Sequence, residues 1–479
     1  MKAYLTVYLS MILAVLLSLY FALVEGVRRN GITLETECIM DIGMNSILAE
    51  YHRELFQKYN ILAIDSSYGE KDGGKEKVGR HLLEYVRNNT NKVFGAGWFY
   101  KDFFGLEAAD AQIEHVCLLT DEDGAVFRQE AIEAIADDYG ISFLTVFSDW
   151  ITEVDKHQLT ELNVEEQKKL VDEQLDSYRG KEVEVSKGLF QKVQFANPDA
   201  ELDRIRCEGV LAWVMDDVTK ISDKVICQDI LLPGRRFWGN VNKGSLKHGN
   251  TRDYEELISK GLFVAYLLKY MGCYTEPKKE GALSYQIEYI LNGKDSDIEN
   301  LTATVDGLVW IREAANLLYL YTDTEKQEQA DTLAFALSLA AHKPDAKKVF
   351  KQSILLGWAY AESLYDIESL LKGKRIPIMK DKSSWYYSME GALSIGSTKE
   401  NDEHNNEGLN YQEYLAVLLA FATNENLNIR AMTIVEADIR QTKGNAEFQI
   451  DRCITDVEAF LRMRSTYGYG ETLRKRKAY

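Results

Sequence analysis

The strongest pattern in the chain is an apolar run at its start, over residues 3–24. No charged residue lies between Lys2 and Glu25. About 22 residues at about 1.5 Å each make a helix of about 33 Å, which spans a hydrocarbon core of about 30 Å. Its serines and threonine can bond to the helix's own carbonyls, and its tyrosines lie toward the ends, where aromatic rings suit the interface. The run therefore predicts a membrane-spanning helix that contacts the lipid bilayer.

A cleaved signal peptide is the alternative for this run. Signal peptides have an apolar region of about 7–15 residues followed by a small-x-small cleavage site. The run here is longer, and no Ala-x-Ala pattern follows it. The flanking positive charges, Lys2 before the helix and Arg28 and Arg29 after it, are nearly balanced, but an acidic body beyond the helix is compatible with export. We expect an uncleaved single-pass anchor in the cell membrane, with a cytoplasmic N-terminus and an extracellular body.

A second apolar pattern follows the anchor and has helical spacing. Residues recur every fourth position, which is one face of an amphipathic helix; they are Ile39, Gly43, Ile47, Tyr51, Leu55 and Tyr59. Glycines at 26 and 31 make a bend between the two helical parts plausible. The short apolar run 61–64, closed by polar residues and Gly69, is typical of a buried strand and turn. The pattern predicts one long helix whose outer half packs on a sheet.

The remaining chain alternates between helical and strand patterns. Strands are expected over 111–119 and 283–291, with two more within 446–462. Pro344 separates the last two of three helices within 298–371. Further helices are expected over 78–86, 126–139, 254–270, 411–422 and 427–441, and a charged, solvated helical arm over 152–192. The predicted fold class is α+β, with a largely helical middle and C-terminal strands.

Composition narrows the classes of partner. The chain is 27% charged, with a net charge of −19. Nucleic acid is disfavoured, because binding phosphates requires a basic face. The six cysteines contain no CxxC pair, so they give no metal or thioredoxin signal. Their even number permits disulfides, although scattered buried thiols are the simpler expectation.

Catalytic and metal-binding motifs are absent from the sequence. It has no GxSxG, P-loop, HExxH or dinucleotide fingerprint, and its seven histidines stand singly. Residues 121–124 resemble the opening of a calcium loop but lack its spacing and its closing Glu. Four residues of a polar loop could gather a cation, although a solvated loop is favoured: Asp402, Glu403, His404 and Glu407. We expect no catalytic residue, metal or cofactor, and a protein that is not an enzyme.

Two groups of charged residues are candidate contacts. Glu25 and Arg28 are three positions apart and share a helix face, so they could pair with each other, or Glu25 could meet a basic residue on a neighbouring anchor. A basic cluster within the predicted loop 231–251 could bind an anionic envelope polymer, although a solvated loop with an aromatic plug is the simpler reading. Its members are Arg235, Arg236, Lys243, Lys247 and His248, beside Phe237 and Trp238. The basic residues 474–477 are expected to form a solvated, disordered tail.

Several short segments carry a resemblance to a known family. They are Thr6-Val7, residues 23–28, 45–65, 285–291, 311–316 and 409–415. In these segments the chain resembles a family of unknown function: single-pass membrane proteins of clostridia and related Gram-positive bacteria, commonly found beside tight-adherence (Tad) pilus genes. The N-terminal layout is also similar to TadE- and TadG-like minor pilins. Pilin precursors have a Gly before the apolar helix and a Glu near the new start, whereas here Glu25 follows the helix, so prepilin processing is doubtful.

The resemblance implies a function and a division of the chain. We expect an anchor (1–25), a helix-plus-sheet pilin-like region (26–150), a charged helical arm (151–200) and a mixed α+β domain (201–479). The implied function is a membrane-anchored extracytoplasmic component of a Tad-type pilus or secretion assembly, which binds or scaffolds other membrane proteins of that apparatus. The alternatives are a surface module that binds anionic envelope polymers and, less favoured, an envelope hydrolase.

Overall fold

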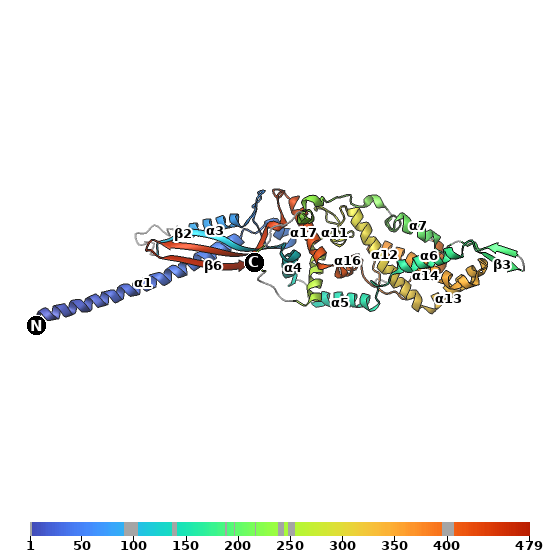
Figure 1. Cartoon of the computed structure of the whole chain (residues 1–479), viewed down its shortest axis with the longest axis horizontal. Coiled ribbons are helices and arrows are strands. Elements are labelled where there is room, and N and C mark those ends of the chain that lie inside the picture. Colours follow the sequence, from blue (N-terminus) through green and yellow to red (C-terminus); the bar gives the residue numbers. More distant parts are fainter. Residues whose placement is uncertain are drawn as a thin grey trace. The chain divides into compact units, whose positions relative to one another are not determined.

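The computed structural model describes residues 2–90, 104–136, 141–186, 189–195, 197–215, 217–237, 244–247, 254–394 and 407–479. The fold is α+β: mostly helical, with a long apolar N-terminal helix and a small antiparallel sheet (Figure 1). The chain forms two compact units. Unit 1 comprises Met1–Ala134, Asp229–Asp253 and Val435–Tyr479, and unit 2 comprises Ile135–Gln228 and Tyr254–Ile434.

Helix α1 (Lys2–Leu48) organises unit 1 and has two different halves. Residues 4–23 are all exposed, and this apolar half is long enough to cross a membrane, as an anchor or a signal sequence. From Ile32 onward one face is buried, with Met40, Met44 and Ile47 inaccessible. The helix passes through Gly26 and Gly31 without interruption.

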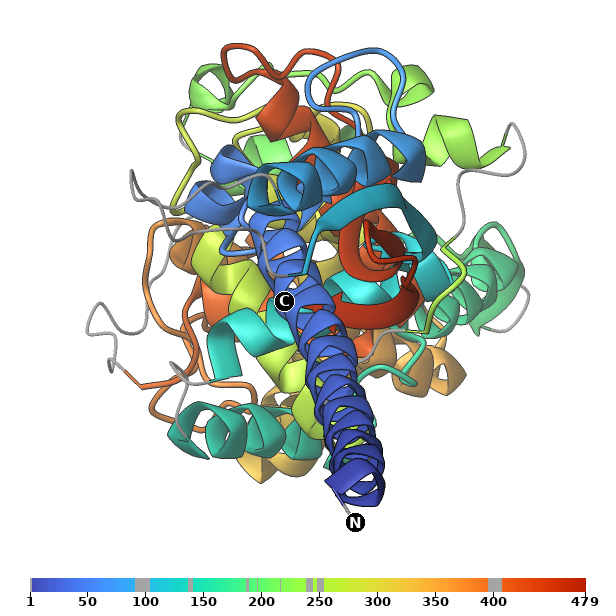
Figure 2. The ribbon, with the colours of Figure 1, turned by 90° about the vertical axis from the view of Figure 1, so that its left-hand side faces the viewer.

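The sheet of unit 1 is built around one central strand. Strand β5 (Cys453–Ser465) pairs antiparallel with β2 (Leu106–Leu118) on one side, and with β6 (Gly470–Ala478) and the short β1 (Ile64–Asp65) on the other. The buried half of α1 packs with α3 (Lys75–Thr90) and this sheet around one core (Figure 2). The predicted helix-on-sheet arrangement is confirmed.

Three local predictions in unit 1 are wrong in part. The amphipathic helix ends at Leu48 and restarts as α2 (Arg53–Tyr59), so Tyr51 lies exposed between them. The two strands expected within 446–462 are a 3-10 turn (Ile450–Arg452) followed by β5 alone. Residues 474–477 are not a disordered tail, because they lie in β6 and each has a partner on a neighbouring element. These partners are Glu114, Asp41, Asp456 and Asn45.

Unit 2 is built mainly from helices. Its long helices are α12 (Asp297–Thr322), α13 (Thr324–Ala340) and α14 (Lys347–Leu371), as the sequence predicted around Pro344. The others include α5 (Ile141–Lys156), α6 (Val164–Tyr178), α7 (Ala200–Glu208), α8 (Leu211–Val214), α10 (Glu256–Tyr270), α11 (Gln286–Asn292), α15 (Met389–Ser394) and α16 (Tyr411–Phe421). Three further helices contain residues of unit 1: α4 (Asp121–Ala136), α9 (Leu232–Phe237) and α17 (Asn424–Arg440).

The strand predicted over 283–291 is wrong, because most of this segment is helix α11. Its polar and apolar residues alternate, yet Gln286 to Ile290 are all buried, so the alternation does not mark two faces of a strand. Inside the unit, one carboxylate oxygen of Glu288 accepts hydrogen bonds from the Tyr411 hydroxyl and the Tyr274 backbone N–H, both at 2.8 Å. The helix ends at Gly293, whose φ of +66° is the left-handed conformation favoured by glycine at helix C-termini.

The charged arm is only partly as predicted. Helix α6 buries one face, which includes Val164, Val171 and Leu175. The chain after it is not helical but forms a hairpin of β3 (Glu182–Ser186) and β4 (Leu189–Lys192). All six cysteines are free thiols, three buried and three exposed.

Candidate functional site

The predicted pair Glu25 and Arg28 lies where the apolar half of α1 ends, and its members contact each other at 3.2 Å. Both also contact the turn between β5 and β6. The Tyr469 hydroxyl donates a hydrogen bond to Glu25. The Arg28 guanidinium lies over the Tyr467 ring, 4.1 Å from its centroid, in a cation–π contact. We call these four residues, Glu25, Arg28, Tyr467 and Tyr469, the collar.

The turn that supplies the two tyrosines is held by backbone hydrogen bonds. The Ser465 amide donates to the Tyr469 carbonyl at 2.7 Å, and the Thr466 amide donates to the Gly105 carbonyl at 2.9 Å. Gly468 has a φ of +86°, which a residue with a Cβ rarely adopts. The ring of Phe104 packs on α1 at Gly31, where a Cβ would clash with it. Side chains and backbone thus fix the turn against α1.

The sequence identified only half of the collar. Glu25 and Arg28 stand out because they flank the apolar run. Tyr467 and Tyr469 carry no such signal, since Tyr469 is 444 positions from Glu25. Whether Glu25 also meets a neighbouring anchor stays a prediction.

The basic cluster of the 231–251 segment is described only in part. Arg235 lies in helix α9 of unit 1 and is 19% exposed, because it forms a bidentate pair with Glu436 at 2.7 and 2.8 Å. Its Nε also contacts Asp451, at 3.2 Å. The positive charge of Arg235 is therefore neutralised within the unit.

Of the other members of that basic cluster, only Lys247 has a described side chain. Lys247 is exposed, and its carbonyl accepts a hydrogen bond from Arg476. Lys243, His248, Trp238 and the side chains of Arg236 and Phe237 lie outside the described residues.

The sequence offered two acidic segments as possible cation sites. The first is explained by a turn, and most of the second lies outside the described residues. The 121–124 segment is a turn, with Glu122, Asp123 and Gly124 in the left-handed region. Asp121 accepts the backbone N–H groups of Leu118 and Gly244, at 2.7 and 2.8 Å. In the other loop, Asp402, Glu403 and His404 lie outside the described residues.

A third acidic cluster, in unit 2, was not found from the sequence. Asp172, Asp199 and Asp203 bring their carboxylates within 4.8 Å of one another. The Lys168 ammonium contacts all three, at 2.7, 2.8 and 3.0 Å respectively. A lysine therefore already occupies the position where a metal ion would neutralise these carboxylates.

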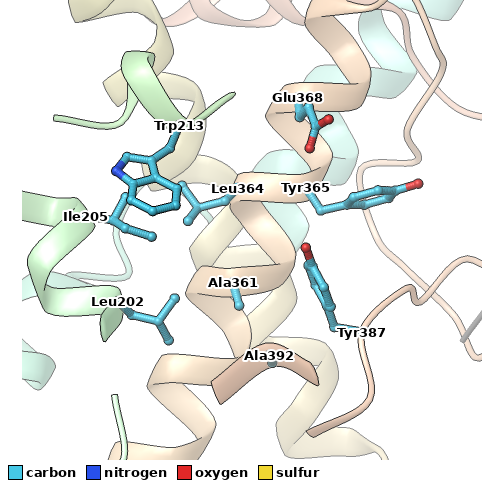
Figure 3. Close-up of a pocket in the computed structure, with 9 residues that line it drawn as sticks. All are labelled: Leu202, Ile205, Trp213, Ala361, Leu364, Tyr365, Glu368, Tyr387 and Ala392. Carbon is cyan, nitrogen blue, oxygen red and sulfur yellow. The ribbon is translucent and has the colours of Figure 1, made fainter. Parts of the chain in front are cut away.

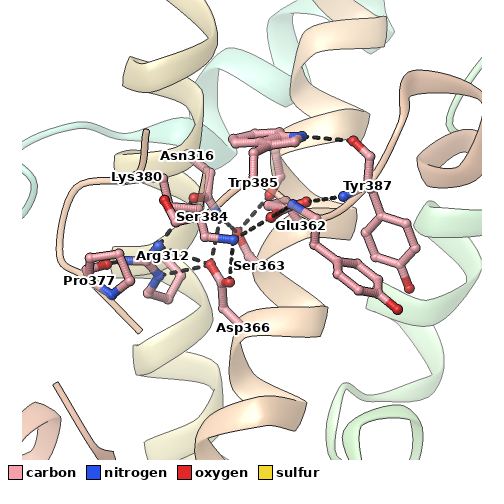
Figure 4. A network of polar contacts seen from close by, with 12 residues as sticks. Arg312, Asn316, Glu362, Ser363, Asp366, Pro377, Lys380, Ser384, Trp385 and Tyr387 are labelled. Atoms are coloured by element: carbon pink, nitrogen blue, oxygen red, sulfur yellow. Dashed lines mark hydrogen bonds and ion pairs between the residues drawn. The ribbon is translucent and has the colours of Figure 1, made fainter. Parts of the chain in front are cut away.

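A fully buried polar cluster joins α12 and α14 to the segment after α14 (Figure 4). Arg312 contacts Asp366 at 3.0 Å, and Lys380 contacts Asp366 at 2.6 Å and also Glu362. All four side chains are at most 1% exposed. We call them the buried quartet; its two cations and two carboxylates sum to zero charge.

Further hydrogen bonds complete the quartet. Glu362 accepts the backbone N–H groups of Tyr386 and Tyr387, both at 2.8 Å. Arg312 donates to the carbonyls of Pro377 and Ile378, at 2.8 and 2.7 Å. The quartet therefore holds the 376–387 segment on the helices.

Burial and charge act in opposite directions on the two carboxyls. Burial raises the pKa of Glu362, even though Lys380 favours its ionised form. Burial also opposes ionisation of Asp366, but Lys380 and Arg312 outweigh it and bring the pKa of that carboxyl below its usual value. Asp366 is thus the firmly ionised member, and Glu362 is the member that a change in its surroundings would protonate first.

A small recess lies beside this segment, between α14 and the α7–α8 region (Figure 3). Its volume is about 100 Å³, which is below the range of roughly 300–1,000 Å³ typical of ligand pockets. Its wall is mostly apolar and aromatic, and its single carboxylate, that of Glu368, pairs with Lys372 at 2.6 Å. The recess could accept a small apolar group, and its geometry indicates no particular ligand.

Comparison with known proteins places most of the chain in one family. Residues 190–465, more than half of the chain, match a family of unknown function, DUF5702. No curated protein and no solved structure matches the chain. The family match shows no link to Tad pili. The chain belongs to DUF5702, a family of unknown function.

Proposed function

We propose that the protein is a membrane-anchored extracytoplasmic component of a Tad-type pilus or secretion assembly, which acts by binding or scaffolding and not by catalysis. The observation that carries this proposal is the change in surroundings along α1. Its apolar residues 4–23 are exposed, whereas Ile32, Met40 and Ile47 belong to the core of unit 1. One unbroken helix therefore serves as both anchor and core element.

This arrangement has a mechanical consequence. A large contiguous apolar surface on a helix is stable in hydrocarbon and unfavourable in water. Because α1 continues directly into the core, unit 1 has no free linker between itself and the bilayer. A body held in this way keeps a defined distance from the membrane, which suits a scaffold.

The Tad assignment itself rests on the sequence resemblance. The apolar N-terminal helix and the folded body after it are similar to the layout of minor pilins. Because Glu25 follows the apolar helix, whereas a processed pilin has its Glu near the start of that helix, we expect an assembly-associated membrane protein and not a processed fibre subunit.

The polymer-binding alternative has less support. Arg235 is paired with two carboxylates, and Arg474, Lys475 and Arg476 each contact an acidic side chain of unit 1. Arg235 and these three residues of β6 are thus neutralised within unit 1, whereas Lys247 is exposed.

Co-purification tests the proposal. The full chain, cross-linked in cells and isolated from membranes, should bring down the pilus ATPase or platform proteins. A matched variant, with residues 3–24 replaced by an unrelated apolar anchor, shows whether the contact runs through the helix or the body. Recovery of no component of the apparatus with the natural chain would contradict the assignment.

A further inference from the structure

The collar lies at a depth that the continuity of α1 defines. If residues 3–24 span the hydrocarbon core, Arg28 is four residues beyond its edge. At about 1.5 Å per residue this is about 6 Å, which lies within the polar headgroup layer of roughly 5–7 Å on each side of the core. The helix is unbroken here, so no turn moves Arg28 away from this depth.

The tip of the β5–β6 hairpin, residues 465–470, is fixed at the same level. Tyr469 bonds to Glu25, and the Arg28 guanidinium lies over the Tyr467 ring. Figure 1 shows the apolar half of α1 continuing past this end of the sheet. Since both tyrosines contact the first helical turn after the anchor, the tip reaches the headgroup layer along with that turn.

The exposed chemistry of the tip suits such a layer. Tyr467 keeps 47% of its surface exposed although it contacts Arg28. Arg29 on α1 and Arg464 at the end of β5 are both exposed. Tyrosine rings are enriched at membrane interfaces, and guanidinium groups match phosphate geometry.

We propose that the β5–β6 tip is a second membrane contact, in which Tyr467, Arg29 and Arg464 lie among the phosphate headgroups of the bilayer. The proposal rests on the proposed function, because it requires α1 to be a retained anchor. Helix and tip together give unit 1 two attachments, which restrict how far the body can tilt about the anchor. Anionic lipid should strengthen the contact, since two of the three residues are cations.

Depth-dependent quenching tests the contact in the full chain. The exposed cysteines 38, 207 and 227 are replaced by serine, and one new cysteine is introduced for a fluorescent label. Thr466→Cys places the label at the tip. Lys71→Cys is the matched control: it is also exposed and follows β1, which pairs with the opposite end of β5, about 40 Å away for 13 residues of strand.

Both labelled proteins are reconstituted into vesicles of phosphatidylcholine and phosphatidylglycerol that carry a headgroup nitroxide quencher. Flotation with the vesicles is measured first. We expect both proteins to float, and the label at 466 to be quenched several-fold more strongly than the label at 71. The additional change Tyr467→Ser should reduce that difference.

Two results would overturn the inference, and they are distinguishable. Failure of the full chain to float would show that residues 3–24 do not anchor it, and the tip contact, which requires the anchor, would fall with it. Flotation with equal, weak quenching at both positions would retain the anchor and show that the tip stays clear of the headgroups.

Discussion

Removing the charge of Lys380 is the most informative perturbation of unit 2. In Lys380→Met the side chain keeps its approximate volume, but Glu362 and Asp366 lose their shared cation. The quartet then contains two carboxylates and only Arg312, which contacts Asp366 and not Glu362. A net negative charge remains in a site where every member is at most 1% exposed.

The expected loss in the free energy of unfolding follows from this burial. Breaking a buried ion pair by removing one partner typically costs about 3–5 kcal/mol, because the remaining charge has no compensation. For a unit of this size such a loss lowers the melting temperature by on the order of 10 °C. The deficit should shrink as the pH falls, because burial already raises the pKa of Glu362 and a protonated Glu362 needs no cation.

Urea unfolding of the full chain, followed by tryptophan fluorescence, measures this cost. Trp385 is a local reporter, since the Lys380 ammonium lies 5.6 Å from its ring centroid. Lys382→Met is the matched control: it breaks the pair with Glu325 on an 80% exposed lysine, where about 0–1 kcal/mol is expected. Equal unfolding midpoints for the two variants would refute the reasoning.

Three further outcomes follow from unit 1, the collar and unit 2. Ile47→Asp should lower the stability of unit 1 by several kcal/mol, because Ile47 is fully buried. Ile42→Asp on the same helix should be nearly neutral, because Ile42 is 46% exposed. Equal melting curves for the two variants would show that Ile47 faces water or a partner. Because Glu25 already has two internal partners, the Glu25→Gln variant should still insert into the membrane and still co-purify with pilus components. Loss of co-purification, restored by a compensating change on the partner, would identify Glu25 as the assembly contact. Burial raises the pKa of Glu288 to about 7, so its contribution to the free energy of unfolding is complete below about pH 4.5 and is lost as the pH rises toward 7, by on the order of 3 kcal/mol. Glu288→Gln should flatten the dependence of stability on pH in this range. An unchanged slope would argue against this role of Glu288.

The sequence predicted the elements whose signals are local and periodic. The apolar run and the four-residue recurrence after it identified both halves of α1, and Pro344 divided α13 from α14. Alternation misled at residues 283–291, because a helix buried on all sides has no polar face. There the polar positions reflect internal partners, such as Tyr411 for Glu288.

The contacts that define the collar and the Arg235 cluster were not predictable in the same way. Arg235 meets Glu436 across 201 positions, and Glu25 meets Tyr469 across 444. Neither pairing follows from local spacing, and only the folded sheet and helices bring these residues together. The position of Arg235 among basic residues in the sequence therefore did not reveal its acidic partners in the fold.

Protease accessibility in wall-stripped cells tests the central claim most directly. Protease is added to intact protoplasts, and the fragments of this chain are separated into membrane and soluble fractions. A retained anchor with an external body predicts digestion of the body and a membrane-held stub of a few kilodaltons that contains residues 3–24. A body that stays protected in intact protoplasts would reverse the orientation, and a soluble mature form beginning near residue 25 would show that the helix is a cleaved signal.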